Sequence, residues 1–459
     1  MTESWFAALA AVMLVASLGG AALAAAESPD DGEETVVWRP SVPDVHDVEE
    51  PSADGTATVG GEEFDSIEAA LEAAEPGETV LVEGVFEERI VVGTEGVTIA
   101  ATEPDGAVVD GGGADTVVEI TAENVTLDGL WVRGSGTERS AEDAGILIEG
   151  SEATVTELRL IDVTYGIYVD GAEDVTIEGT TIAGGEDVPV SERGNGIHLW
   201  EADGAEIRDN YVTTVRDGIY YQWSEGVLAE GNVLWELRYG VHYMYSDDNR
   251  FEGNAAFDND VGFALMVSSN LTVVDNLAVA NDGASSHGIL VKDVDDSEIR
   301  GNDVVANGNG LYVYNSQDNL IAENLLLENA VGLYASAGTS GELVVGNSFV
   351  ANDESAYATT NAHVAWNDDE RGNYWSDARA VDLDGDGTSE VRHQPAGAVE
   401  RLVNDQPVAA AFASSPAFDA IGLAESSFPV VDSATVVDER PLAEPPHEDW
   451  RSYYEDHDH

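Results

Sequence analysis

The chain has 459 residues and a formal net charge of −72, because 90 Asp and Glu stand against 18 Lys and Arg. Such a charge disfavours binding to nucleic acids and to anionic membrane surfaces, while the 43% of hydrophobic residues distinguishes the chain from an acidic disordered protein. Molar salt screens charges within about 3 Å and would relieve the self-repulsion, so the composition is typical of a very salty habitat. The absence of cysteine excludes disulfides, thiolate nucleophiles and Cys-based zinc sites, so a soft metal would need His and Met.

An unbroken run of apolar or small residues extends from Trp5 to Ala26. Its small-residue end, Ala22-x-Ala24 or Ala24-x-Ala26, favours a cleavable export signal over residues 1–26. The alternative is an uncleaved anchor, since the run is about long enough to span a bilayer. Both interpretations place the rest of the chain outside the cytoplasm, in the periplasm or on the outer face of the membrane. Residues 27–60 are rich in Pro and acids and are expected to form a flexible linker.

The stretch Phe64–Gly84 predicts a short helix followed by a strand. Ile67, Leu71 and Ala74 recur on one helical face, and Pro76-Gly77 ends the helix before the strand. We expect this segment to cap the N-terminal end of the fold that follows, because an exposed sheet edge invites aggregation.

A repeat of 22 residues runs through the middle of the chain. From Gly196, a Gly followed by an apolar residue recurs at spacings of 22, 22, 22, 26, 22 and 22, and from Asn210 an Asn recurs at 22, 22, 22, 26, 22 and 23. The shared step of 26 marks an insertion within residues 281–287. Short β-branched runs at this period predict an all-β, right-handed parallel β-helix over residues 61–371. The recurring Asn is expected to be structural, because its amide can bond along the stack of coils.

The coil containing GVHYMYSDDN, Gly240–Asn249, illustrates the expected alternation of side chains. Counted from the Gly, positions +1, +3 and +5 are mostly apolar and are expected to face the core; they include Tyr245 and the matching Trp223. Positions +2 and +4 should then face outward. His242 and Met244 occupy these outward positions.

Met266 occupies the same register as Met244 in the next coil, so the two should lie about 4.8 Å apart at the backbone. Two thioethers and the imidazole of His242 would select Cu(I) over hard cations. His198 lies two coils from His242, about 10 Å away, and could relay the ion or form a second site. The alternative is that these are surface residues that contact a partner, a common use of Met.

Aromatic residues flank this group at outward positions in neighbouring coils. Their type and exposure favour a docking surface for a partner over metal ligation. They are Trp200, Tyr220, Tyr312 and Tyr314.

The C-terminal region 372–441 is expected to form an irregular cap and to contain the loop DLDGDGTSE. Asp382, Asp384 and Asp386 occupy positions 1, 3 and 5 of a calcium-type loop and Glu390 occupies position 9, while position 12 is His393 in place of the usual Glu. The prediction is a structural Ca²⁺ site, and the alternative is an acidic turn. Residues 442–459 are expected to be an acidic tail. Its terminal EDHDH, with His457 and His459, could bind a metal weakly but is expected to be frayed.

Taken together, these motifs resemble the NosD family, the periplasmic β-helix proteins of nitrous oxide reductase maturation. The resemblance rests on the cap segment, the 22-residue coils, GVHYMYSDDN, GNYWSD (Gly372–Asp377) followed by DLDGDG, and SSPAFDA (Ser414–Ala420). It implies a non-catalytic protein that works with the ATPase and permease subunits of an ABC transporter and helps to supply copper to nitrous oxide reductase. A copper-donating lipoprotein is a further partner that the resemblance implies.

Two other functions stay open at this point. A carbohydrate lyase, epimerase or hydrolase could use the same fold and would need acid and base residues in a groove; Asp247, Asp248 and Arg238 are candidates. The other alternative is a structural surface protein that binds neither metal nor sugar.

Overall fold

A computed structural model describes residues 38–45, 50–185, 187–359, 361–378, 380–394 and 436–454. The N-terminal apolar run, the SSPAFDA stretch, His457 and His459 lie outside these residues. No helix among the described residues is long and apolar enough to cross a membrane.

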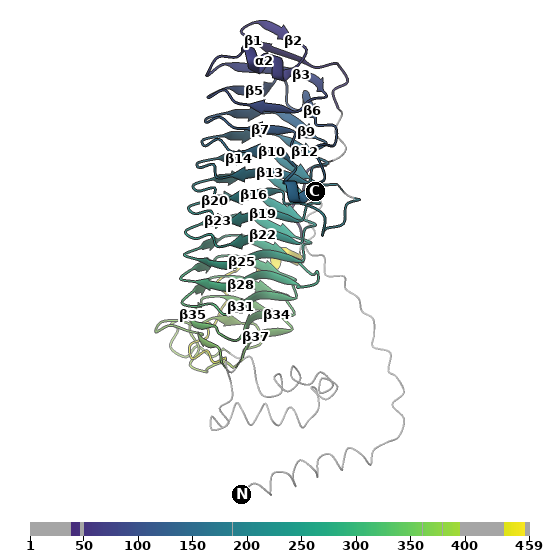
Figure 1. Ribbon diagram of the computed structural model, residues 1–459. Helices are drawn as coiled ribbons and strands as arrows, with labels where there is room; N and C mark the ends of the chain where they lie inside the picture. The colour runs from purple at the N-terminus through teal and green to yellow at the C-terminus, as the bar shows by residue number, and fades with distance from the viewer. Residues whose placement is uncertain are drawn as a thin grey trace. The chain divides into compact units, whose positions relative to one another are not determined.

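The described chain forms a parallel β-solenoid, as predicted, with coils that stack in chain order (Figure 1). One face of the solenoid is a 12-stranded parallel sheet. Its strands are β4 (Ile90–Val92), β7 (Val118–Ile120), β10 (Ala144–Ile148), β13 (Tyr165–Asp170), β16 (Ile197–Trp200), β19 (Asp217–Gln222), β22 (Tyr239–Met244), β25 (Val261–Ser269), β28 (His287–Asp295), β31 (Asn309–Tyr314), β34 (Val331–Ala335) and β37 (Glu354–Ala358).

Two further parallel stacks complete each coil and are joined at the N-terminal end through β3 (Thr79–Phe86), which pairs with the first strand of each. One stack comprises β5 (Thr98–Ala101), β8 (Thr126–Asp128), β11 (Thr154–Thr156), β14 (Thr176–Glu178), β17 (Glu206–Arg208), β20 (Leu228–Glu230), β23 (Arg250–Glu252), β26 (Thr272–Val274), β29 (Glu298–Arg300), β32 (Leu320–Ala322), β35 (Ser340–Val345) and β38 (His363–Ala365). The other comprises β6 (Ala107–Asp110), β9 (Leu130–Arg133), β12 (Arg159–Ile161), β15 (Thr181–Ala183), β18 (Tyr211–Thr213), β21 (Val233–Trp235), β24 (Ala255–Phe257), β27 (Leu277–Val279), β30 (Asp303–Val305), β33 (Leu325–Leu327), β36 (Ser348–Val350) and β39 (Tyr374–Trp375).

The repeating glycine marks a close approach between successive coils. A Cβ added at Gly240 would lie 2.6 Å from the carbonyl oxygen of Gly262, and one at Gly218 would lie 2.5 Å from that of Gly240. Only glycine fits such a contact without moving the backbone, which explains why the residue recurs at each coil.

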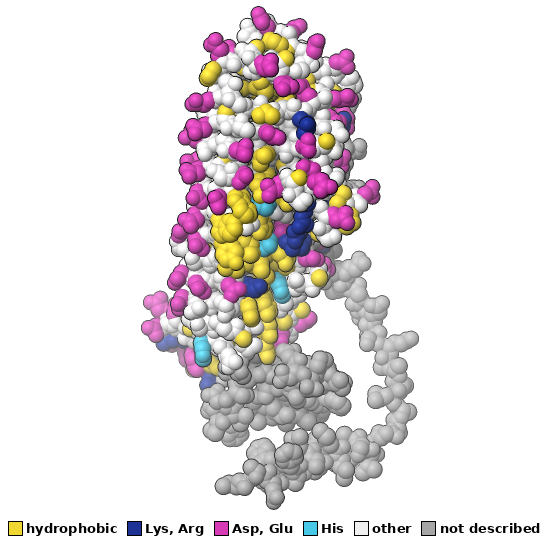
Figure 2. All heavy atoms as spheres, viewed as in Figure 1, with side chains coloured by type: hydrophobic (Ala, Val, Ile, Leu, Met, Phe, Trp, Pro, Cys, Tyr) yellow, Lys and Arg dark blue, Asp and Glu magenta, His cyan; other side chains and the backbone are white. Residues whose placement is uncertain are grey.

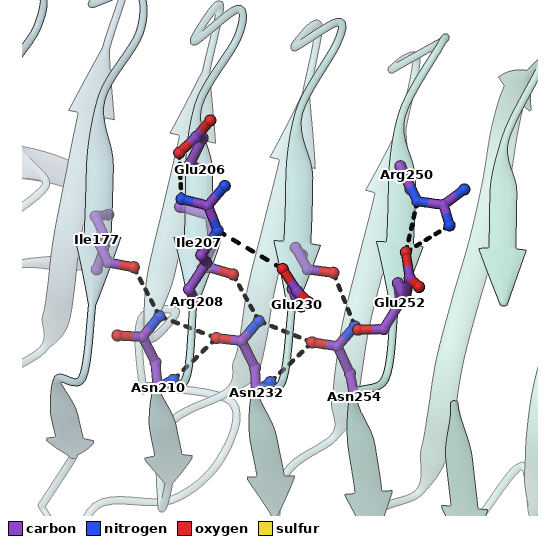
Figure 3. Close-up of polar contacts among 11 residues, drawn as sticks. Ile177, Glu206, Ile207, Arg208, Asn210, Glu230, Asn232, Arg250, Glu252 and Asn254 are labelled. Carbon is purple, nitrogen blue, oxygen red and sulfur yellow. Dashed lines mark hydrogen bonds and ion pairs between the residues drawn. The ribbon is translucent and has the colours of Figure 1, made fainter. Parts of the chain in front are cut away.

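The recurring Asn forms a buried ladder, as predicted. The Nδ2 of Asn232 donates to the Oδ1 of Asn254 at 2.8 Å, and the backbone amide of Asn232 donates to the same oxygen at 2.9 Å (Figure 3). The pattern continues from Asn210 to Asn373. The Oδ1 of each Asn after Asn210 accepts from the backbone amide and from the side-chain amide of the Asn in the preceding coil. A second ladder, which the sequence analysis missed, joins Asn259, Asn281, Asn307, Asn329 and Asn352.

The N-terminal cap is the predicted helix together with a hairpin. Helix α2 (Ile67–Ala73) begins at Ser66, whose hydroxyl accepts from the amide of Ala69, and buries Ile67 and Leu71. Strand β1 (Thr56–Val59) pairs antiparallel with both β2 (Glu62–Phe64) and β3, so it covers the edge of the first coil. The expectation that the linker extends to residue 60 was therefore wrong, because Ala57 and Val59 are buried in the cap.

The C-terminal cap is irregular, as predicted, and is organised around one buried carboxylate. The Asp438 carboxylate accepts from the backbone amide of Asn373 and from the indole N–H of Trp375, each at 2.8 Å. Trp375 belongs to β39, which pairs with β36, so the parallel stack extends past the expected limit of residue 371.

The segments expected to be linker and tail instead cover an apolar stripe on the outside of the solenoid. Trp235, Phe257 and Leu325 belong to this stripe, against which Trp450 and Tyr453 pack. The short η3 helix (Trp450–Tyr454) lies here, and Trp38 contacts Tyr453 with ring centroids 6.1 Å apart. Part of the expected acidic tail therefore packs on the coils through Trp450 and Tyr453, while the end expected to be frayed lies outside the described residues.

Candidate metal site and the surrounding face

The outward +2 positions form one continuous column on the 12-stranded sheet. Each residue pairs in register with its equivalent in the next coil. In chain order the column is Tyr168, His198, Tyr220, His242, Ala264, Leu290, Tyr312, Tyr334 and Tyr357. Because strands in a sheet lie about 4.8 Å apart, neighbouring rings stack and shield one another.

His242 is held by a buried carboxylate from the preceding coil. Its Nδ1 lies 3.1 Å from Oδ2 of Asp217, whose side chain is 1% exposed. Arg238 binds both oxygens of Asp217, with Nε 2.8 Å from Oδ1. The rings of Tyr220 and Tyr239 meet the imidazole edge-on, at 4.8 and 5.0 Å between centroids. The imidazole therefore has a fixed orientation.

These contacts also fix the tautomer of His242. Burial alone would raise the pKa of Asp217, but hydrogen bonds from His242 and Arg238 hold that pKa below its ordinary value, so the carboxylate is ionised. An ionised carboxylate only accepts hydrogen bonds, so in the neutral imidazole Nδ1 carries the hydrogen and Nε2 keeps its lone pair. A carboxylate behind a histidine in this way is the usual support of a metal-binding imidazole.

Met244 and Met266 lie two residues beyond the last paired residues of β22 and β25, so their side-by-side register stays a prediction. In the paired strands β22 and β25, His242 lies opposite Ala264, and each of these residues is two positions before a methionine. Met266 pairs with Lys292 of the following strand, β28. Both methionines are half-buried, and Met266 packs against the apolar side chains of its own and the next coil. The two thioethers thus stand on adjacent strands, beside the strand position of His242.

His198 is placed differently and does not join this group. Its ring is sandwiched between Tyr168, at 4.4 Å, and Tyr220, at 4.7 Å between centroids, and Tyr220 separates it from His242. Burial lowers the pKa of His198 to about 3, so the ring is neutral. The Asn195 amide lies 3.1 Å from Nδ1 and donates to it, which leaves the hydrogen on a buried Nε2. His198 therefore presents no free lone pair to a metal.

At the turn after β22, the prediction that position +5 faces the core is wrong. Val241 and Tyr243 are buried, as predicted, but Tyr245 is 50% exposed and Trp223 is 44% exposed. Both have a left-handed backbone, with φ of 55° and 53°. This conformation turns the chain directly after the strand, so position +5 leaves the alternation and points to solvent.

These residues extend an aromatic row beside the methionines. Trp200 and Trp223 contact edge to face at 4.8 Å between ring centroids, and Trp223 and Tyr245 stack at 6.1 Å. Figure 2 shows apolar side chains gathered over the middle of this face, with histidine and basic side chains beside them, while acidic side chains crowd elsewhere on the surface in view. The gathering agrees with the expected docking surface, which stays a prediction.

The remaining predicted aromatics lie further along the same sheet. Tyr312 stacks on His287 at 4.8 Å and contacts Tyr334 at 5.1 Å between ring centroids. Tyr314 is 39% exposed. They are part of the same outer face but lie beyond Met266.

Asp217 is the residue that the sequence reasoning missed. It directly precedes Gly218, and in the following coils the paired position holds Tyr239, then Val261, then His287. An acidic residue at a position that the next three coils fill with Tyr, Val and His was the available signal, but 90 acidic residues in the chain obscured it.

The Asp-rich loop brings together three of its four predicted ligands. Carboxylate oxygens of Asp382, Asp384 and Glu390 lie within 4.8 Å of one another, and all three residues are exposed. Asp386 does not join them, because its carboxylate accepts from the amide and hydroxyl of Thr388 at 2.8 and 2.7 Å. Calcium binding by the loop stays a prediction.

The candidate acid and base residues of a carbohydrate enzyme all have structural partners. Arg238 is held by Asp217, the Asp247 carboxylate accepts from the amide of Ser269 at 2.6 Å, and Asp248 bonds an Asn side chain of the next coil. These contacts position turns and give no arrangement of a free acid opposite a free base.

Comparison with protein families supplies independent information. Residues 179–380 match the family model described as periplasmic copper-binding protein (NosD). The chain is 38% identical over 358 residues to a protein of Pseudomonas aeruginosa named probable ABC transporter binding protein NosD, covering 74% of this chain and 83% of that protein. It is 36% identical over 360 residues to the protein of the same name from Stutzerimonas stutzeri, covering 75% and 82%.

Solved structures that resemble this one are parallel β-helix proteins. The A-module of mannuronan C-5 epimerase AlgE6 from Azotobacter vinelandii superposes with a TM-score of 0.52 at 16% identity, covering 66% of this chain and 93% of that one. A PL6 alginate lyase in complex with a trisaccharide gives a TM-score of 0.50 at 15% identity, covering 66% and 80%. At such identities these likenesses show the fold alone.

Proposed function

This chain belongs to the NosD family of periplasmic copper-binding proteins, and from that premise we propose that it carries Cu(I) outside the cytoplasm for delivery to nitrous oxide reductase. It would act with the ATPase and permease of an ABC transporter, in keeping with the name of its relatives. A copper-donating lipoprotein would load it. Copper is the cargo in this proposal, and the export segment of residues 1–26 would bring the chain to that compartment.

The observation that carries the proposal is the arrangement of His242 with Met244 and Met266. Asp217 holds Nδ1 of His242, which leaves Nε2 as the nitrogen that would bind copper. The two methionines follow on adjacent strands, two residues beyond the pair His242 and Ala264. Soft thioethers with an imidazole select Cu(I). All three ligands are neutral, so the bound ion would keep its single positive charge.

A delivery protein needs a site that can also release its ion. Three ligands on the outer face of a rigid sheet leave one side of the ion open, where a ligand of the acceptor protein can enter before the others leave. The exposed Trp223 and Tyr245 lie in the neighbouring turns and would help to seat that acceptor.

The test is a Cu(I) titration of the exported chain against a chromophoric Cu(I) chelator, in molar salt and without oxygen. Removing both thioethers, in Met244→Ala with Met266→Ala, should weaken binding at least tenfold, and His242→Gln should do the same. His363→Gln is a matched control, because His363 is exposed on β38 of another stack. Unchanged affinity in the double methionine variant would remove the proposed site.

A further inference from the structure

A second feature of the same face is a group of arginines in an acidic chain. Arg216 and Arg238 occupy equivalent turns of successive coils, where the amide of Arg238 donates to the carbonyl of Arg216 at 2.9 Å. Arg139 comes from the η1 helix (Arg139–Ala141), in a loop three coils before Arg216. With 18 basic residues in 459, three neighbouring arginines need a physical reason.

Two of these arginines have no acidic partner among the residues that the structure describes. Most other arginines there form an ion pair with Asp or Glu, as Arg238 does with Asp217. Arg139 donates only to the backbone carbonyl of Ser191, at 2.9 Å. Arg216 is half-buried and its guanidinium makes no hydrogen bond or ion pair within the described chain. Both oxygens of the nearby Asp217 are already taken by Arg238 and His242.

Arg139 and Arg216 lie at one place on the surface. Arg139 bonds Ser191, and the amide of Arg216 donates to the carbonyl of Gly194, three residues further along the same loop, at 2.8 Å. Burial raises the pKa of Tyr165, and the positive charges of both arginines act against that rise. Burial and the charge of Arg238 lower the pKa of Arg216. Both guanidinium charges therefore act on Tyr165, and burial together with the charges of Arg238 and Arg139 outweighs the opposite effect of Asp217 on Arg216.

A third hydrogen-bond donor without an acceptor lies among the same aromatic rings. His198 is 8% exposed and contacts Tyr165 at 5.7 Å between ring centroids. Because Asn195 donates to Nδ1, the neutral ring carries its hydrogen on Nε2, which is buried without a partner. A buried donor without an acceptor is unfavourable, so an acceptor that reached Nε2 would stabilise this ring.

We propose that Arg139 and Arg216, beside Tyr165 and His198, form a binding site for a carboxylate ligand. A guanidinium presents paired donors that match the two oxygens of a carboxylate. A carboxylate only accepts hydrogen bonds, so it could pair with the donors of both guanidinium groups and with the Nε2–H of His198. The source is a free dicarboxylate or an acidic side chain of another protein.

Molar salt would make such a site effective on a protein as acidic as this one. At low salt a net charge of −72 repels any anion at long range. At 1 M salt the screening length is about 3 Å, so only charges in direct contact act on the ligand. Local arginines then decide the binding, and the distant carboxylates have little effect.

The experiment is an NMR titration of the exported chain labelled with ¹⁵N-arginine and ¹⁵N-histidine, in 1 M NaCl. The probes are succinate, as a free dicarboxylate, and hexaglutamate, as an acidic protein segment, with hexaglutamine as the neutral control. The Nε–H signal of Arg216 should shift saturably with at least one of the two acidic probes. Saturation by succinate identifies a free carboxylate as sufficient, and saturation by hexaglutamate alone identifies a protein segment.

The matched variants separate this site from general charge effects. Arg139→Gln with Arg216→Gln should weaken binding of the acidic probe at least fivefold, as followed by the His198 ring signals. Arg300→Gln, which removes a comparable charge from β29 where Arg300 pairs with Glu298, should change it less than twofold. Equal loss in both variants, or no saturable shift of Arg216 in the parent, would overturn the proposal. Neither result bears on Cu(I) binding, which is measured separately.

Discussion

The most informative single substitution is Asp217→Asn, because it changes one hydrogen at His242 with little change in shape. Asp217 forces the hydrogen onto Nδ1 and frees Nε2. An amide in its place can donate to Nδ1, which would move the hydrogen to Nε2. The protein already contains this second arrangement, since Asn195 donates to Nδ1 of His198.

The loss of the free lone pair should weaken Cu(I) binding by about 10–100-fold, the usual effect of removing the group that supports a metal-binding histidine. That range corresponds to about 1.4–2.8 kcal/mol. Arg238 also loses its charged partner, so we expect the chain to lose about 1–3 kcal/mol of stability and to remain folded.

Two measurements together test this reasoning. A chelator competition in molar salt gives the Cu(I) affinity, and long-range ¹H–¹⁵N correlations of the His242 ring give the position of the hydrogen. Glu142→Gln is the charge control, because it removes one exposed carboxylate from the same face without contacting His242. A variant with its hydrogen on Nε2 and an affinity within twofold of the parent would refute the argument.

Three further predictions concern the framework. Replacing Asn254 by Ala leaves buried partners of the ladder unpaired. At about 1 kcal/mol for each lost hydrogen bond, the free energy of unfolding measured with a chemical denaturant should fall by about 3–4 kcal/mol. The control, Gln317→Ala on the exposed surface, should change it by less than about 0.5 kcal/mol. Burial raises the pKa of Glu342 from 4.5 to about 7, so its contribution to stability is complete below pH 4.5 and is lost as the pH rises to 7. Glu342→Gln should therefore match the parent at pH 4.5 and exceed it by up to about 3 kcal/mol above pH 7; parallel stability curves for the two proteins would contradict this. Ending the chain before residues 442–459 should expose the apolar stripe under Trp450, increase binding of a hydrophobic dye and cost at least about 2 kcal/mol; an unchanged dye signal would show that the stripe is covered in another way.

The parts of the fold that repeat could be predicted from the sequence. The Gly and Asn columns recur at 22 residues because each coil meets the same constraint, namely a close backbone approach for Gly240 and a buried hydrogen bond for Asn232. The second ladder has the same spacing from Asn259, so that signal was present and was overlooked.

Other features depend on single residues or on distant parts of the chain. One left-handed residue at Tyr245 reverses the facing that strict alternation predicts, and many residue types adopt this conformation in the turns. The packing of Trp38 and Tyr453 on the coils joins segments more than 400 positions apart, which no local pattern records.

The candidate metal ligands were predicted from their register in the strands, but the carboxylate that holds His242 was not predicted. The strand period of two predicts that Met244, Met266 and His242 share one face, and this prediction came from the sequence alone. Asp217 bonds His242 from 25 positions earlier, at the turn that opens its coil, where alternation gives no guidance. His198 was predicted to face outward as a possible ligand, and its burial was not predicted. The stacking of Tyr168 and Tyr220 on its ring depends on side-chain orientation, which strand alternation does not give.

The central claim is that two thioethers and one imidazole hold Cu(I), and X-ray absorption of the copper-loaded chain tests it most directly. The chain has no cysteine, so any sulfur bound to copper must come from methionine. The account predicts two sulfur scatterers and one imidazole in the parent, and no sulfur after Met244→Ala with Met266→Ala. A copper shell of nitrogen and oxygen alone in the parent, or an unchanged spectrum in the double variant, would contradict it.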